Sequence, residues 1–499
     1  MIELAGVTVR YGTTVAVEDV TFTAPSGEVT GLIGPNGAGK STTLRLIAGL
    51  ERPSSGTVTI DGLRYGELPN PGAAIGVLLD AQWAAPSRTA REHLRWMAAA
   101  IGLPDARVDA ALDLVGLQRV ADRPVGGFSL GMRQRLAIAG AVLGDPPVIV
   151  LDEPVNGLDP EAIAWIRRTL RALADDGRTV LLSSHLLSEL EQTADRIVAL
   201  HEGRVVADAP LADLVEPAPP GRSGLEALYF RLTGDDEPAA TAAATASAPE
   251  AARSRSVARR SVTAETRKAL TSRGFRTTLG GATAVALAAA VVVGVFAAVF
   301  RGATVTTAAY GFGLVGGALI AVAGALLIGL DRDHGTLAIT RILIPSPVLG
   351  YGAKALVAGA SGACAGLAGA AAAIIVGAVT GLSSPAAEIL RLVTAGPVAG
   401  ALLAVLGLAV GHLASSTTAA VGAVLGWWFL VEAIAVPALP FGRALAAWLP
   451  ATNAQLATIG VPANTASWSP WISLAILAGW AAAASVAALA GVRRRIATA

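Results

Sequence analysis

The stretch "GPNGAGKST", residues 34–42, decides the fold of the first half of this 499-residue chain. It fits the pattern G-x-x-x-x-G-K-[ST], whose glycines let backbone N–H groups surround phosphate oxygens because no Cβ blocks the approach. In this pattern Lys40 reaches the β- and γ-phosphates of a nucleotide, and the Ser41 hydroxyl binds Mg²⁺. The residues before it, "GEVTGLIG" (27–34), have the pattern of a strand, and "STTLRLIAGL" (41–50) after it has that of a helix whose N-terminus faces the anion. The sequence therefore predicts a strand–loop–helix unit that binds a nucleoside triphosphate and Mg²⁺.

Lysine usage argues against a chance match in a chain that contains 56 glycines. Lys and Arg together number 38, yet the lysines are confined to Lys40, Lys268 and Lys354. A chain that uses Arg almost everywhere has Lys in this loop, where a compact ammonium is needed.

The composition excludes several classes of protein. Hydrophobic residues make up 53% of the chain and the mean hydropathy is +0.58, too high for an ordinary soluble protein. A net charge of +1 gives no nucleic-acid signature, so no nucleic-acid partner is expected. One cysteine, Cys364, excludes an intrachain disulfide framework. No basic segment followed by an apolar core begins the chain, so we expect no cleavable signal.

The pattern along the chain predicts two domains joined by a linker. Residues 1–234 alternate short apolar strands with helical stretches, as in an α/β domain. Residues 235–262 contain almost no large apolar group and are expected to form a flexible linker. From residue 263 to 499 the charge nearly vanishes, which predicts an all-α transmembrane domain. Residues 263–276 could form an amphipathic helix at the membrane surface or simply extend the linker.

Six long apolar segments each meet or slightly exceed the roughly 20 residues that cross a bilayer as a helix. A buried soluble core could explain one of them, but six in a row predict a lipid bilayer as a partner. Arg and Lys precede the first span and follow the last, so both termini are expected in the cytoplasm. The predicted spans are 278–300, 306–330, 355–380, 392–413, 417–439 and 470–492.

Four further stretches follow the phosphate loop in the sequence. "VIVLDEP" (148–154) is an apolar strand that ends in Asp152, expected to hold Mg²⁺ through water, and Glu153, expected to orient the attacking water. "FSLGMRQR" (128–135) lies between the phosphate loop and this strand. "NGLD" (156–159) and "LLSSHLL" (181–187) follow the strand.

In this order the stretches resemble the nucleotide-binding domain of ATP-binding cassette (ABC) transporters, across nearly all of residues 1–234. The resemblance implies an α/β P-loop ATPase followed by an all-α domain of six transmembrane helices. It implies that Ser129 and Gly131 contact the ATP held by a second cassette, and that Asp159 lies at the seam between the two. Met132 stands where the family usually has Gln. The residues implied to contact ATP in the first cassette are Gly34, Asn36, Gly37, Gly39, Lys40, Ser41 and Thr42.

Two single residues have ordinary structural alternatives. The resemblance makes His185 the switch histidine that senses the γ-phosphate, although a lone histidine is more often structural. It makes Tyr11 the aromatic residue that stacks on adenine, although tyrosines are also common on strand surfaces.

Family members usually have Gln after the strand that matches "IGVLL" (75–79), where it contacts Mg²⁺ and the membrane domain. Asp80 occupies this position and Gln82 follows two residues later, so either could fill the role.

The second half resembles, more weakly, the type-2 exporter class of these transporters. Residues 330–354 are similar to the cytoplasmic coupling segment of that class, although Asp331 and Asp333 could be plain interfacial charges. Residues 440–470 correspond to short re-entrant helices on the outer side. Glu432 lies inside a predicted span, where it could contact a cationic substrate or serve a structural role.

The combination predicts an ATP-hydrolysing exporter in the cell membrane, with its ATPase domain in the cytoplasm. One phosphate loop and one signature per chain predict a homodimer. The expected substrate is an amphipathic small molecule such as a drug, an antibiotic or a lipid. The alternative is a membrane-anchored ATPase that signals or transmits force without moving a solute. A soluble cassette ATPase acting on ribosomes or DNA is excluded by the six spans.

Overall fold

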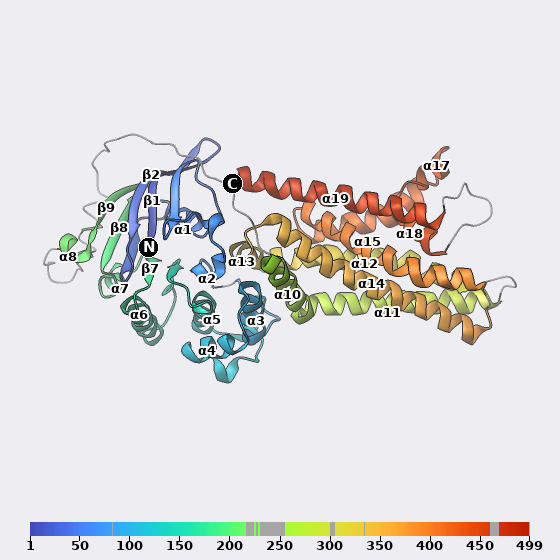
Figure 1. The fold of residues 1–499 in the computed structure, drawn as a ribbon, viewed down its shortest axis with the longest axis horizontal. Helices are drawn as coiled ribbons and strands as arrows, with labels where there is room; N and C mark the ends of the chain where they lie inside the picture. Colours follow the sequence, from blue (N-terminus) through green and yellow to red (C-terminus); the bar gives the residue numbers. More distant parts are fainter. Residues whose placement is uncertain are drawn as a thin grey trace. The chain divides into compact units, whose positions relative to one another are not determined.

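The computed structural model describes residues 1–81, 83–215, 224–225, 228–229, 255–299, 305–333, 335–382, 384–459 and 469–498 (Figure 1). Gln82 and residues 235–254 of the predicted linker lie outside these ranges. The chain forms two compact units. Unit 1 comprises Met1–Ala264, Ala338–Ser346 and Arg495–Ala499, and unit 2 comprises Glu265–Leu337 and Pro347–Arg494.

Unit 1 contains two β-sheets. Strands β1 (Ile2–Tyr11), β2 (Thr14–Ala24) and β4 (Ser55–Ile60) form an antiparallel sheet in the order β2–β1–β4. The larger sheet has the order β5–β6–β7–β3–β8–β9 and is parallel except for its last pair. Its strands are β3 (Val29–Ile33), β5 (Ile75–Leu78), β6 (Val148–Leu151), β7 (Thr179–Ser183), β8 (Arg196–His201) and β9 (Arg204–Pro210).

The central strands are apolar on both faces, as parallel strands covered by helices must be. Every residue of β3, β6 and β7 is buried. The helices of unit 1 are α1 (Lys40–Ile47), α2 (Pro71–Ala74), α3 (Ala90–Ile101), α4 (Ala106–Leu114), α5 (Leu130–Val142), α6 (Pro160–Asp175), α7 (Leu187–Glu191) and α8 (Leu211–Leu214). The predicted α/β architecture is confirmed.

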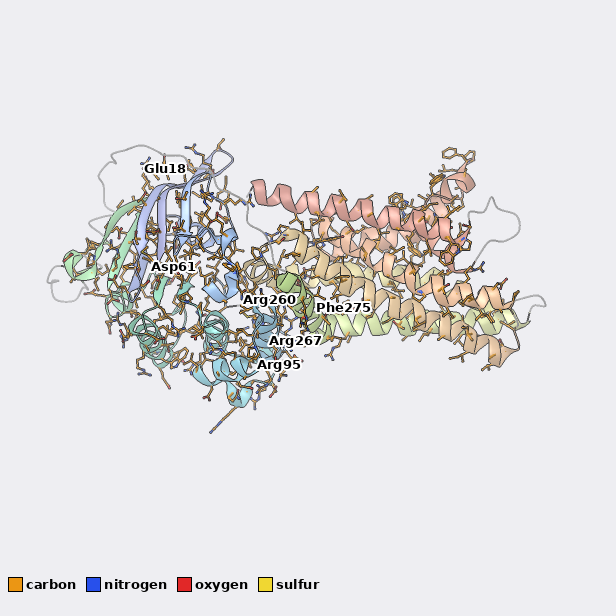
Figure 2. The ribbon with its side chains drawn as sticks, in the orientation of Figure 1. Glu18, Asp61, Arg95, Arg260, Arg267 and Phe275 are labelled. Atoms are coloured by element: carbon orange, nitrogen blue, oxygen red, sulfur yellow. The ribbon has the colours of Figure 1, made fainter. Side chains whose placement is uncertain are left out.

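The two sheets are joined by polar contacts at β2. Glu18, labelled in Figure 2, pairs with Arg204 of β9 at 2.9 Å, and its backbone N–H donates to the carbonyl of Gly203. Within the antiparallel sheet, Asp61, also labelled there, follows β4 and pairs at 2.6 Å with the N-terminal ammonium, which precedes β1. These groups are partly exposed, so the pairs orient the strands more than they stabilise the fold.

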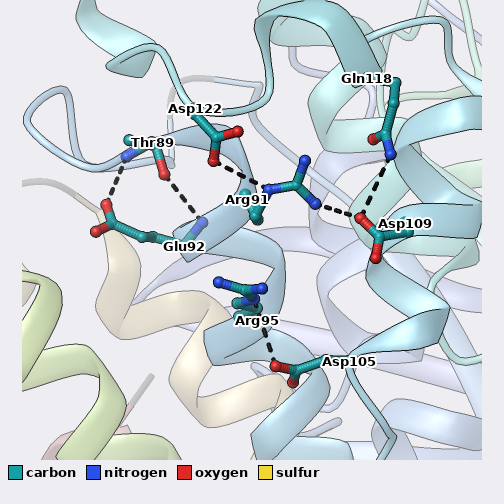
Figure 3. A network of polar contacts seen from close by, with 8 residues as sticks. All are labelled: Thr89, Arg91, Glu92, Arg95, Asp105, Asp109, Gln118 and Asp122. Carbon is teal, nitrogen blue, oxygen red and sulfur yellow. Dashed lines mark hydrogen bonds and ion pairs between the residues drawn. The ribbon is translucent and has the colours of Figure 1, made fainter.

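Helix α3 begins with a capping box and is tied to its neighbours by arginines (Figure 3). The Thr89 hydroxyl accepts from the N–H of Glu92, whose carboxylate accepts from the N–H of Thr89. Such reciprocal bonds satisfy two donors that a helix start otherwise leaves unpaired. Arg91 pairs with Asp109 of α4 and with Asp122, which connects α3 to α4.

The segment Ala338–Ser346 belongs to unit 1, although it lies between helices of unit 2 in the sequence. It contains most of α13 (Thr336–Leu343). Ile342 is part of the same core cluster as Tyr65, which begins the short 3₁₀ turn η1 (Tyr65–Glu67). The Tyr65 hydroxyl donates to the Ile342 carbonyl at 2.7 Å, and burial raises the pKa of Tyr65. This placement favours the coupling-segment interpretation.

Unit 2 is helical. In the described part of the chain, six helices are long and apolar enough to cross a membrane. Their candidate spans are Phe275–Phe296, Val315–Asp333, Pro347–Thr380, Ala386–Leu413, Thr417–Ala435 and Pro470–Val492, within helices α11 (Arg273–Val299), α12 (Val305–Asp333), α14 (Pro347–Thr380), α15 (Ala386–Leu413), α16 (Thr417–Leu425) with its π-helical continuation η4 (Gly426–Ala435), and α19 (Pro470–Thr498). The prediction of six long apolar helices is confirmed for the described residues, although the fifth helix ends at Ala435 and not at residue 439.

The prediction of a flexible linker is wrong for residues 255–262. Residues 255–262 form the start of helix α10 (Arg255–Thr271), which also shows that residues 263–271 do not extend a linker. Ser261 is 1% exposed and Ala264 is fully buried. Small and charged residues therefore supply much of the buried face of this helix, which a search for large apolar groups does not detect.

Glycines bring α14 and α15 into backbone contact. A Cβ on Gly362 would lie 2.2 Å from the carbonyl oxygen of Gly400, and one on Gly366 would lie 2.4 Å from that of Gly396. No side chain fits at these distances. The small-residue pairs 362/366 and 396/400 therefore pack against each other, as G-x-x-x-G spacing does in membrane helices.

A cluster of four charged side chains is buried in unit 2. Asp331, near the end of α12, accepts from the ammonium groups of Lys268 at 2.7 Å and Lys354 at 2.5 Å. Lys354 also donates to Glu265 at 2.7 Å, and each of these side chains is at most 6% exposed. Asp331 is thus not a plain interfacial charge. The cluster contains two of the three lysines of the chain.

Glu432 serves a structural role in unit 2. Its two carboxylate oxygens accept hydrogen bonds from Trp427 Nε1 (2.7 Å), the backbone N–H groups of Ala451 (3.1 Å) and Thr452 (2.9 Å), and the Thr452 hydroxyl (3.2 Å). The two N–H groups belong to the first turn of α18 (Pro450–Ile459), where they have no partner within the helix. Glu432 therefore caps α18 from another helix, and its oxygens are already occupied by these donors. Short helices α17 (Gly442–Ala446) and α18 occupy the predicted re-entrant region.

Candidate active site

A cleft in unit 1 brings the phosphate loop and the acidic pair together. The loop joins β3 to α1, and Asp152 follows β6 in the same parallel sheet. Carboxyl ends of parallel strands meet at one edge of a sheet, where ligands commonly bind. The cleft is lined by Ala16, Asn36, Gly37, Gly39, Lys40, Ser41, Thr42, Leu79, Asp152 and Glu153.

The backbone of the loop requires glycine at defined positions. Gly39, the N-cap of α1, has a φ of 96°. A Cβ on Gly34 would lie 2.3 Å from the carbonyl oxygen of Leu200. The Lys40 ammonium donates to the carbonyls of Gly34 at 2.6 Å and Pro35 at 3.1 Å, so it lies against the loop itself. Burial lowers the pKa of Lys40, and the nearby carboxylates Glu153 and Asp152 oppose this effect.

The acidic pair is held by the next strand of the sheet. Asp152 and Glu153 follow β6, which pairs in parallel with β7. The Ser183 hydroxyl, at the end of β7, donates to Asp152 Oδ1 at 2.5 Å and accepts from the Glu153 N–H at 2.9 Å. His185 Nδ1 lies 2.6 Å from Glu153 Oε2. The histidine predicted from the "LLSSHLL" stretch therefore contacts the predicted catalytic carboxylate rather than a remote structural partner.

The remaining predicted residues lie outside the cleft lining. Tyr11 ends β1, where its hydroxyl donates to Glu51, and burial raises the pKa of Tyr11 to about 12. Asp80 follows β5 and lines a separate pocket together with Trp83 and Ile342. Its predicted contact with Mg²⁺ stays a prediction.

Ser129 and Asp159 are exposed, and each is the N-cap of a helix, whereas Gly131 is half-buried. Ser129 is the N-cap of α5, and its hydroxyl accepts from the N–H of Met132 at 3.2 Å. Asp159 is the N-cap of α6 and accepts from the N–H of Ala162 at 2.8 Å. Ser129, Gly131 and Asp159 are not among the residues that line the cleft of their own chain.

Sequence reasoning missed Ser183. The available signal was a hydroxyl residue at the end of the apolar run "TVLL" (179–182), two positions before His185. It also missed Ala16, whose place in the cleft arises only from the folding of β2 against the loop and leaves no mark in the sequence.

Comparison with known proteins agrees with this geometry. The family described as ABC transporter matches residues 17–156. The chain is 37% identical over 217 residues to the bacitracin transport ATP-binding protein BcrA of Enterococcus faecalis, covering 43% of this chain and 70% of that protein. It is 38% identical over 220 residues to the Nod factor export ATP-binding protein I of Rhizobium leguminosarum bv. viciae (43% and 71%). It is 34% identical over 208 residues to the lantibiotic transport ATP-binding protein SrtF of Streptococcus pyogenes (42% and 90%).

These relatives match fewer than half of the residues of this chain but most of their own. The residues matched by the family include the phosphate loop, Asp152 and Glu153. The chain belongs to the ATP-binding cassette family of ABC transporters, and it binds and hydrolyses ATP to support transport.

Proposed function

We propose that this chain is an ATP-driven exporter that works as a homodimer and moves an amphipathic small molecule, such as a drug, an antibiotic or a lipid, out of the cytoplasm. The observation that carries the proposal is the presence, in one chain, of a cleft that combines the phosphate loop with Asp152 and Glu153 and of six helices long and apolar enough to span a membrane. The names of the relatives, which refer to bacitracin and lantibiotic transport and to Nod factor export, support the direction and the substrate class. We assign the ATPase to residues 1–234 and the linker to residues 235–254.

The residues of the cleft suit Mg²⁺. The Ser41 hydroxyl and the Asp152 carboxylate line the same cleft and are oxygen donors, which Mg²⁺ prefers. The described residues contain no group of three or more His, Cys, Asp or Glu side chains that could hold a metal alone. This agrees with an ion held by one or two protein oxygens together with phosphate oxygens and water. When bound, it neutralises charge on the phosphates.

Three groups of the chain act on ATP in this proposal. Lys40 contacts the terminal phosphates and stabilises the charge that develops on them. Glu153 orients the attacking water and accepts its proton. His185, hydrogen-bonded to Glu153, fixes the carboxylate and senses the γ-phosphate. Asp80 provides the link to the coupling segment, because it lines the same unit 1 pocket as Ile339 and Ile342 of that segment.

The proposed orientation follows the positive residues. Arg and Lys cluster before the first span and after the last, and such residues favour the cytoplasmic side. Both termini and the ATPase are therefore assigned to the cytoplasm.

Transport into inverted membrane vesicles tests the proposal. A solute that stimulates ATP hydrolysis should accumulate in vesicles in the presence of ATP but not with the Lys40→Ala variant. The competing function is signalling or transmission of force by a membrane-anchored ATPase. ATP hydrolysis without movement of any stimulating solute would favour that alternative.

The homodimer predicts complementation between two inactive variants. In a mixed dimer of Lys40→Ala and Ser129→Arg chains, one site carries both changes. The other site combines the intact loop of the Ser129 variant with the intact signature of the Lys40 variant. That site should trap ATP, although neither variant does so alone, because each ATP is shared between two chains. Differential affinity tags confirm that mixed dimers form, and mixed dimers that trap no ATP would contradict the shared site.

A further inference from the structure

We propose that Ser183 is a positioning residue for ATP hydrolysis, whose hydroxyl orients both members of the acidic pair at once. Ser183 is fully buried at the end of β7, beside β6 on one side and β3 on the other. Its hydroxyl lies 2.5 Å from Asp152 Oδ1 and 2.9 Å from the backbone nitrogen of Glu153.

The direction of both hydrogen bonds follows from chemistry. A backbone N–H can only donate, so the Ser183 oxygen accepts from Glu153. The hydroxyl proton is then directed to Asp152, because an ionised carboxylate can only accept. One small side chain therefore satisfies a backbone donor and orients a carboxylate.

The backbone at Glu153 makes this contact important. Glu153 has a φ of 48°, in the left-handed region that residues other than glycine rarely adopt. Such a conformation persists only where the surroundings hold it. The bond from the Glu153 N–H to Ser183 holds the peptide that precedes the Glu153 side chain. The carboxylate is thereby directed toward His185, 2.6 Å away.

Ser183 also restricts Asp152. The hydrogen bond from Ser183 to Oδ1 restrains rotation of the carboxylate, and its other oxygen is not engaged by this hydroxyl. Loss of the hydroxyl removes both restraints without changing the phosphate loop. The expected defect is therefore in turnover and not in ATP binding.

Ser183→Thr and Ser183→Val test this in the full-length chain, because Thr and Val have nearly the same shape and differ in the hydroxyl. Ser184→Ala is the matched control. Ser184 is adjacent and 2% exposed, but its hydroxyl accepts from the N–H of Leu186 and contacts neither acidic residue. The measurements are kcat and KM for ATP, ATP affinity in EDTA, and the thermal stability of each variant.

We expect Ser183→Val to lower kcat about tenfold relative to Ser183→Thr, the loss typical of one hydrogen bond to a charged group. Between the Val and Thr variants, KM and ATP affinity in EDTA should agree within about twofold. Their melting temperatures should agree within a few degrees. Ser184→Ala should retain normal kcat. Equal kcat values for the Thr and Val variants overturn the proposal.

A purely structural role for Ser183 would lower stability and ATP affinity together with kcat. That outcome also overturns the proposal. If the added methyl group prevents folding of both variants, Ser183→Ala compared with Ser184→Ala decides the question. A selective fall in kcat for Ser183→Ala supports the positioning role, and equal values for the two variants contradict it.

Discussion

Replacing Glu153 with Gln should slow ATP hydrolysis by a factor of about 10²–10⁴, the usual contribution of a positioned general base. The amide keeps the size of the side chain but cannot accept a proton from water. ATP binding should be unchanged, because Lys40 and the loop backbone are not altered. Steady-state hydrolysis and nucleotide affinity, measured on the same purified protein, separate the two effects.

The control for this variant is Glu161→Gln. Glu161 is an exposed acidic residue in the first turn of α6 and does not line the cleft. Its change to Gln should leave turnover within about twofold. Near-normal turnover of Glu153→Gln would show that another group activates the water. His185, which contacts Glu153, would then be the next residue to change.

Replacing Asp331 with Asn should strongly destabilise unit 2. Asp331 accepts from both Lys268 and Lys354, so the variant leaves two buried ammonium groups with the single carboxylate of Glu265. Breaking a buried ion pair from one side typically costs about 3–5 kcal/mol. In a domain of this size that corresponds to a fall of roughly 6–20 °C in the apparent melting temperature. Thermal unfolding of the full-length protein in detergent measures it.

Two variants make the Asp331 result specific. Asp333→Asn changes an exposed aspartate two residues along the same helix, where Asp333 accepts from the Thr417 hydroxyl, and should cost less than about 1 kcal/mol. Asp331→Asn combined with Lys268→Met restores equal numbers of positive and negative groups and should recover much of the loss. Equal stabilities of the Asp331 and Asp333 variants would contradict the role of the buried cluster.

The Asp331 effect should also depend on pH. Burial lowers the pKa of Lys268 to about 8. Because this pKa is below that of the unfolded chain, the folded protein binds fewer protons between the two values and gains stability as pH rises. Without Asp331 the pKa of Lys268 should fall further, so the gain in stability with rising pH should begin at lower pH. The stability difference between Asp331→Asn and the unaltered protein should therefore be smaller at pH 9 than at pH 7.

The sequence by itself determined the class of the fold and the centre of the ATP site. Glycine spacing around Lys40 and the acidic end of "VIVLDEP" (148–154) are local patterns, because loop backbone geometry and strand composition depend on neighbouring residues. The apolar spans are equally local, since a bilayer imposes a length and a composition on each helix separately. The structure places the phosphate loop and the acidic pair in one cleft, and it contains, among the described residues, six helices long and apolar enough to cross a membrane.

Only the tertiary structure decided which distant polar groups are partners. Ser183 contacts Asp152 because β6 and β7 are neighbours in the sheet. The order of strands in a sheet cannot be predicted from the sequence of either strand. Glu432 caps the N-terminus of α18 because α18 folds back against it. Asp331 is buried and forms ion pairs with two lysines that belong to other helices. A buried charge is stable only when its partners come from several directions, and that arrangement exists only after the chain has folded.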